Sequence, residues 1–136
     1  MRKMDFEYLE FLTDYGIVHR PYIEVSLKYR RRSVFVLSMV DSGADFSTFA
    51  TGIGELLGLN VKSGEMREVV GIGKKPIPVF LHTIRLCVDK HEFKFIAGFG
   101  DDLPPILGQE GFFEYFDVGF SYSKKRIKLI PAKKTR

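Results

Sequence analysis

The chain has no tryptophan, only one cysteine and no long apolar run. Cys87 alone cannot form an intrachain disulfide, and nothing else in the sequence indicates an oxidising compartment. No window approaches the roughly 18 unbroken apolar residues of a membrane-spanning helix. Residues 1–7 turn acidic at once and lack the apolar segment of a signal peptide. We therefore expect a cytoplasmic protein that makes no membrane contact.

Basic residues are concentrated in two short segments, although the net charge is +4. Seven of the 21 lie in 124–136, which leaves 14 basic against 17 acidic residues, a net charge of −3, in the rest. Another three form the turn at 30–32. No aromatic residues interleave with these charges, so we expect no nucleic-acid partner. The three histidines, at positions 19, 82 and 91, lack metal-ligand spacing, and we expect no metal or other cofactor.

Aromatic and β-branched residues are abundant, and they favour a single, mainly β domain. The 136 residues include 13 Phe and 6 Tyr, and 45% are hydrophobic. Short apolar or alternating runs between Gly and Pro positions predict strands. These runs are 21–29, 34–40, 67–70, 76–88, 92–97, 106–108, 117–122 and 126–130. Three short helices are also predicted, at 5–12, 54–58 and 109–116.

An acidic motif follows the most apolar of these strands. The run 34–40 leads directly into Asp41-Ser42-Gly43-Ala44-Asp45. A carboxylate at the end of a buried strand is costly unless hydrogen bonds hold its charge. Ser42 supplies a short hydroxyl, and Gly43 lets the backbone turn sharply toward the acid. An ordinary turn aspartate remains the alternative, because Asp-Ser-Gly is common in surface turns.

Two further motifs follow in a fixed order. Gly71-Ile72-Gly73 stands at the tip of a long hairpin within 64–98, and Ile106-Leu107-Gly108 precedes the helix predicted at 109–116. The ordered set resembles the retropepsins, the single-lobe aspartic proteases, from residue 19 to residue 130. Residues 1–18 are then an N-terminal extension containing the first predicted helix, and 131–136 a basic tail.

The resemblance implies a closed β-barrel lobe with one short C-terminal helix, working as a homodimer. It makes Asp41 the catalytic acid and base, supported by Ser42 and Gly43. A peptide or protein substrate would bind as an extended strand. The substrate-binding residues would be Ala44, Asp45, Gly71, Ile72, Gly73 and Ile106. The resemblance also implies that the closing strand at 126–130 contributes to the dimer contact.

The chemistry explains why such a protein needs two copies. Two carboxylates in contact cannot both ionise, so their pKa values separate and the pair can accept one proton while donating another; aspartic proteases are a standard example of this pairing. The sequence has no internal repeat and one Asp-Ser-Gly motif, so the second carboxylate would come from a second chain. Asp101-Asp102 lacks the same Gly and hydroxyl context and is interpreted as a loop.

One position departs from the viral pattern. Viral retropepsins usually carry Arg directly after the apolar-apolar-Gly segment, where it pairs with the acid equivalent to Asp45. This chain has Gln109 there, followed by Glu110.

A second function class stays open, a catalytically silent retropepsin-like module that binds peptides or supports assembly. The intact Asp-Ser-Gly favours the protease, because a silent module has no need of a costly carboxylate pair.

Overall fold

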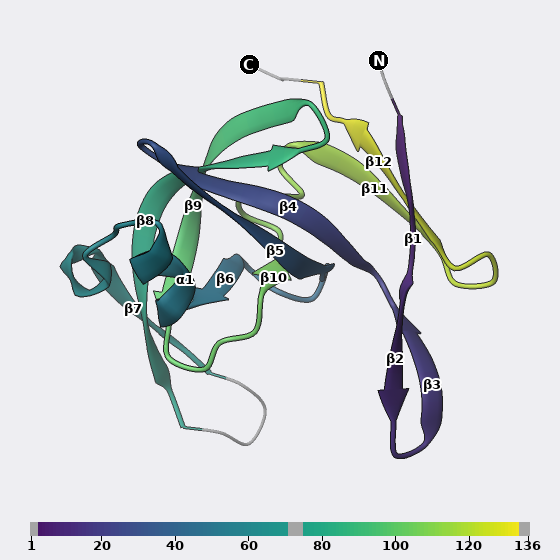
Figure 1. Ribbon diagram of the computed structural model, residues 1–136, viewed down its shortest axis with the longest axis horizontal. Helices are drawn as coiled ribbons and strands as arrows, with labels where there is room; N and C mark the ends of the chain where they lie inside the picture. Colours follow the sequence, from purple (N-terminus) through teal and green to yellow (C-terminus); the bar gives the residue numbers. More distant parts are fainter. Residues whose placement is uncertain (1–2, 71–74, 134–136) are drawn as a thin grey trace.

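The computed structural model describes residues 3–70 and 75–133, in which strands dominate (Figure 1). The described part contains one α-helix, α1 (Thr51–Leu56), and a single 3₁₀ turn at Val61–Ser63. Its strands are β1 (Met4–Glu7), β2 (Leu9–Thr13), β3 (Gly16–Arg20), β4 (Tyr22–Tyr29), β5 (Arg32–Val40), β6 (Ser47–Ala50), β7 (Glu65–Val69), β8 (Ile77–Val88), β9 (His91–Gly100), β10 (Ile106–Leu107), β11 (Phe116–Ser121) and β12 (Arg126–Pro131).

Six strands close into a barrel. The largest sheet has the order β4-β5-β10-β6-β9-β8-β7, and β4 pairs with β8 as well. This second pairing, from Ser26 opposite Cys87 to Lys28 opposite Arg85, joins the first strand of the sheet to β8 and closes the ring. Strand β7 lies outside the ring and forms a hairpin with the long β8 (Figure 1). The predicted closed β-barrel lobe is confirmed.

Alternating side chains explain why these segments form the barrel. In β4, Ile23, Val25 and Leu27 are buried, whereas Glu24 between them is exposed. Such alternation places one face of a strand toward the core. Leu86 of β8 and Phe99 of β9 are fully buried in the same core. The strands predicted from these runs are confirmed, with small shifts at their ends.

The helix predicted at 5–12 is wrong. Its residues lie in β1 and β2, and β1 pairs antiparallel with β12. Met4 and Tyr8 are buried, and the intervening Asp5 and Glu7 are exposed. This period of two matches a strand, and both acids pair with Arg126 of β12, at 2.8 and 3.3 Å. Pairing with a distant strand thus outweighs the local helical pattern.

The helix predicted at 109–116 is also wrong, so the single described helix is not the C-terminal one that the resemblance implied. The backbone N–H groups of Gln109 and Glu110 bond to the Ala44 and Asp45 carbonyls, both at 2.9 Å. Gly111 has φ of +92°, which a right-handed helix cannot accommodate. The helix predicted at 54–58 forms slightly earlier, as α1, and Gly58 follows it with φ of +83°.

Candidate active site

Asp41 stands where β5 ends, beside the short central strand β10. Strand β10 runs parallel to β5, with Leu107 opposite Val40, and antiparallel to β6, with Ile106 opposite Thr48. The Asp41 N–H donates to the Leu107 carbonyl at 3.0 Å. Residues 41–46, here called the Asp41 turn, therefore connect two strands that flank the same third strand. The apolar strand that the sequence predicted does deliver Asp41 to the edge of the core.

Within the turn, the backbone holds the Asp41 side chain. The Gly43 N–H donates to Asp41 Oδ1 at 2.9 Å, and the Ala44 N–H donates to the Asp41 carbonyl at 3.2 Å. A Cβ on residue 43 would lie 3.2 Å from the same Oδ1, so glycine suits this close approach. Within the described residues, no hydrogen bond reaches Asp41 Oδ2. The carboxylate is half-buried and oriented, with one oxygen available to water or to another group.

Gly108 allows segment 108–110 to pack closely against the backbone of the Asp41 turn. A Cβ at this position would lie 2.6 Å from the Phe46 carbonyl oxygen and 2.8 Å from that of Ala44. These are backbone atoms and cannot move aside without distorting the turn. The Gly108 N–H donates to Ser47 Oγ at 3.0 Å, and that hydroxyl donates to the Glu110 carbonyl at 3.1 Å. Hydrogen bonds from segment 108–110 therefore hold the Asp41 turn and the start of β6 in place.

Gln109 is the residue whose role was missed in the sequence. Its Nε2 donates to the Ser42 carbonyl at 2.7 Å, and its backbone N–H bonds to the Ala44 carbonyl at 2.9 Å. The side-chain amide therefore fastens the Asp41 turn at the position where viral retropepsins use Arg. The sequence did contain a signal for this role, because the side-chain amide of a Gln next to a closely packed glycine can donate to a nearby backbone carbonyl. Only the fold shows which carbonyl accepts the bond.

The other predicted site residues are distributed around this turn. Ser42, Gly43 and Asp45 are exposed, whereas Ala44 and Ile106 are half-buried. Within residues 3–70 and 75–133, no hydrogen bond or ion pair holds the Asp45 carboxylate. Gly71, Ile72 and Gly73 lie outside the described residues, so the structure does not place them relative to Asp41.

The Asp101-Asp102 pair is a loop. Asp101 Oδ1 accepts a hydrogen bond from Thr51 Oγ1 at 2.7 Å, next to the start of α1. Asp102 has φ of +59°, in the left-handed region that turns use. In the part of the chain that the structure describes, no cluster of three His, Cys, Asp or Glu side chains could hold a metal ion. No helix there has the length and apolar character to cross a membrane.

Comparison with known proteins gives matches among solved structures only. The crystal structure of a retropepsin-like aspartic protease from Rickettsia conorii superposes with a TM-score of 0.63 and 22% identity, over 94% of this chain and 92% of that chain. The EIAV protease complexed with the inhibitor HBY-793 has a TM-score of 0.49 and 22% identity, over 66% of this chain and 82% of that chain. No family model matches the sequence, and neither does any curated protein. With its closed barrel and the Asp41 turn at the end of β5, this chain has the retropepsin-like fold.

Proposed function

We propose that this chain is an aspartic endopeptidase that acts as a homodimer. The observation that carries the proposal is the Asp41 turn, in which Asp41 Oδ1 is held by the Gly43 N–H at 2.9 Å at the end of a barrel strand. The retropepsin-like fold supports it, since the structure from Rickettsia conorii that shares the fold is described as an aspartic protease. Gly108 and Gln109 hold the backbone of the turn, which keeps the Asp41 carboxylate in a defined position.

The proposed mechanism uses one water molecule between two Asp41 carboxylates, one from each subunit. The ionised carboxylate removes a proton from the water molecule while the water oxygen attacks the peptide carbonyl carbon. The protonated carboxyl donates its proton to the carbonyl oxygen, which gives a neutral gem-diol. Collapse of the gem-diol transfers a proton to the leaving nitrogen and breaks the C–N bond. Gly43 and Gln109 would keep each carboxylate in place during these transfers.

The basic test is cleavage of a mixed peptide library by the purified chain, read by mass spectrometry. We expect cleavage at mildly acidic pH and a falling rate as the solution becomes basic, because the paired carboxylates must keep one proton. A pepstatin-type inhibitor should block cleavage, whereas chelators and serine or cysteine reagents should not. A rate that keeps rising to about pH 9 would instead indicate a metal, serine or cysteine mechanism.

Asp45 is expected to contact substrate. Its carboxylate is exposed, and Gln109 fastens the turn through Ser42, so Asp45 is not needed for that task. Asp45→Asn should raise KM roughly tenfold, as expected for weakened hydrogen bonds from substrate N–H groups to a charged acceptor, with little change in melting temperature. Steady-state kinetics and thermal unfolding measure the two effects.

Glu55→Gln on α1 is the matched control for Asp45, because it also removes one exposed carboxylate charge. It should leave both KM and melting temperature unchanged. If Asp45→Asn lowered the melting temperature strongly while KM stayed constant, Asp45 would have a structural role and its assignment to the substrate groove would be wrong.

A further inference from the structure

One hairpin stands apart from the rest of the fold. Strands β2 and β3 form their own two-stranded sheet, and in the described chain no other strand pairs with either of their outer edges. Figure 1 shows this hairpin projecting away from the barrel and from the sheet of β1, β12 and β11. Two-stranded hairpins are marginally stable in water without further packing. The stability of this hairpin therefore depends on the surfaces against which it packs.

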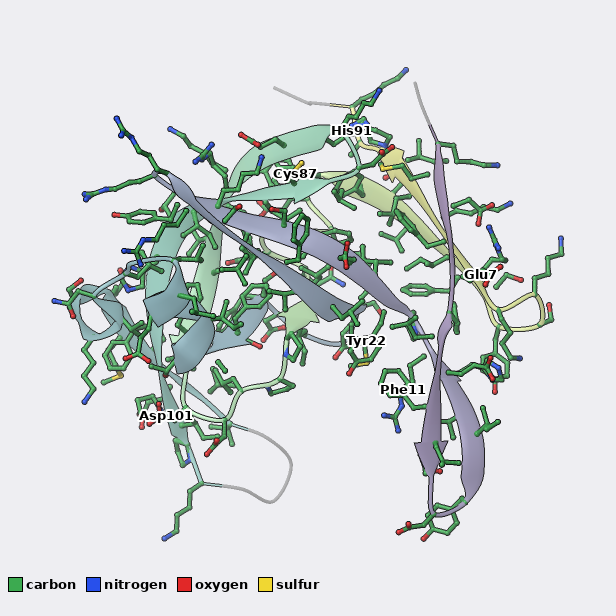
Figure 2. The ribbon with its side chains drawn as sticks, viewed as in Figure 1. Glu7, Phe11, Tyr22, Cys87, His91 and Asp101 are labelled. Atoms are coloured by element: carbon green, nitrogen blue, oxygen red, sulfur yellow. The ribbon has the colours of Figure 1, made fainter. Side chains whose placement is uncertain are left out.

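One face of the hairpin packs against its own chain. Phe11 lies opposite Val18, and both are half-buried. The Phe11 ring lies 4.9 Å from the Tyr22 ring, centroid to centroid, and Figure 2 shows these two side chains together at the root of the hairpin. The Arg20 guanidinium lies 5.3 Å from the Phe11 ring centre. These contacts fix the direction in which the hairpin projects.

The other face carries the cross-strand pair Glu10 and His19, whose side chains approach to 3.9 Å, and becomes apolar and open toward the tip. Leu12 pairs across the strands with Ile17, and these side chains are 86% and 60% exposed. Tyr15, in the turn between the strands, is 99% exposed. A cross-strand apolar pair and an exposed aromatic residue in the adjoining turn are unfavourable for a hairpin that remains in water. We call Leu12, Tyr15 and Ile17 the hairpin tip patch.

The root of the hairpin, where β3 leads through Pro21 into β4, lies next to the Asp41 turn. The Val40 N–H, one residue before Asp41, donates to the Pro21 carbonyl at 2.9 Å, one residue after β3. Five residues in each strand extend the hairpin by roughly 17 Å from this point. A second chain that brought its own Asp41 against this one would lie within reach of the hairpin.

We propose that the hairpin tip patch docks on a second copy of this chain and forms part of the homodimer interface. The inference rests on the proposed function, which requires two Asp41 turns to meet. A stable interface needs about 20 to 30 residues on each side, and a six-residue turn supplies few of them. Two-fold symmetry makes each hairpin contact occur twice, so a small patch has a doubled effect.

The closing strand β12, which the resemblance places in the dimer contact, could contribute to it through side chains but not by strand pairing. Strand β12 lies between β1 and β11, so both of its edges are already paired within the chain. It cannot add a strand from a second copy at either edge while these pairings persist. The outer edges of β1 and β11 are unpaired in the described chain, as are those of the hairpin, and Phe120 and Tyr122 are exposed. What distinguishes the hairpin is its root beside Asp41. The hairpin is therefore better placed than the terminal sheet to contact a second subunit near Asp41.

The test is a triple variant, Leu12→Ser with Tyr15→Ser and Ile17→Ser, studied by sedimentation equilibrium. We expect its dimer dissociation constant to rise roughly 100-fold, because clustered apolar anchors are lost at two symmetric contacts. Its melting temperature at a concentration where wild type is monomeric should match that of wild type, since the three side chains are exposed. Phe35→Ser on β5 is the matched control, because Phe35 is 73% exposed, and it should dimerise like wild type.

Hydrogen exchange provides an independent reading. Amides of β2 and β3 should exchange more slowly as wild-type concentration rises through the dissociation constant, and this change should be absent in the triple variant. If the triple variant dimerises as tightly as wild type, the hairpin inference is overturned while the proposed protease remains. If wild type is monomeric at every concentration yet cleaves peptides, both the hairpin contact and the shared-carboxylate mechanism are overturned.

Discussion

Asp41→Asn is expected to reduce peptide cleavage by roughly 10⁴-fold or more, because the variant removes both the general base and the general acid of the proposed pair. Asparagine has nearly the same shape as aspartate, and its amide oxygen can still accept the bond that the Gly43 N–H gives to Asp41 Oδ1 at 2.9 Å. It cannot take up or release the shared proton. Initial rates on a cleaved library peptide measure the effect.

The fold and the dimer should survive this change. Circular dichroism, thermal unfolding and sedimentation of Asp41→Asn should match wild type, which separates lost chemistry from lost structure. Asp101→Asn serves as the control, because Asp101 bonds to Thr51 in a loop that has no role in the proposed mechanism. Wild-type turnover by a folded Asp41→Asn protein would show that Asp41 is not the catalytic residue.

Mixing wild type with excess Asp41→Asn chains should suppress activity through heterodimers. Each wild-type chain carries one Asp-Ser-Gly motif and depends on its partner for the second carboxylate. At a roughly ninefold excess of variant, about one wild-type chain in ten keeps a wild-type partner by mass action, so activity per wild-type chain should fall about tenfold. Dilution below the dimer dissociation constant should lower turnover per chain for the same reason.

An equal excess of serum albumin should leave the activity unchanged, which controls for nonspecific effects of added protein. Subunit exchange has to be verified with labelled chains before the assay. Unchanged activity per wild-type chain after complete exchange would contradict a site shared between two subunits. It would point instead to a second acid within the same chain.

Periodicity predicted the barrel strands well because their burial follows local alternation. In β4 and β12, apolar side chains at every second position face the core, and the charged residues between them face water. The same reasoning placed Asp41 at the end of an apolar strand, although one face of that strand, with Phe35 and Leu37, is exposed. This placement depends on residues that are close in sequence.

The two wrong helices have a common cause. At 5–12 and 109–116, the local pattern allows a helix, but backbone groups find partners far away in the chain. Strand β1 pairs with β12, about 120 residues later, and the Gln109 N–H bonds to the Ala44 carbonyl. Short helices have little stability of their own, so such long-range hydrogen bonds decide the conformation.

By itself, the sequence determined the mainly β architecture and the position of the Asp-Ser-Gly motif at the end of an apolar strand, because side-chain alternation and turn residues act over a few neighbouring positions. Only the tertiary structure decided that Gln109 fastens the turn through the Ser42 carbonyl, that β12 is covered on both edges, and that Leu12, Tyr15 and Ile17 project into water. These features join segments up to about 120 residues apart, and no local pattern specifies which distant carbonyl, strand edge or surface a residue will meet.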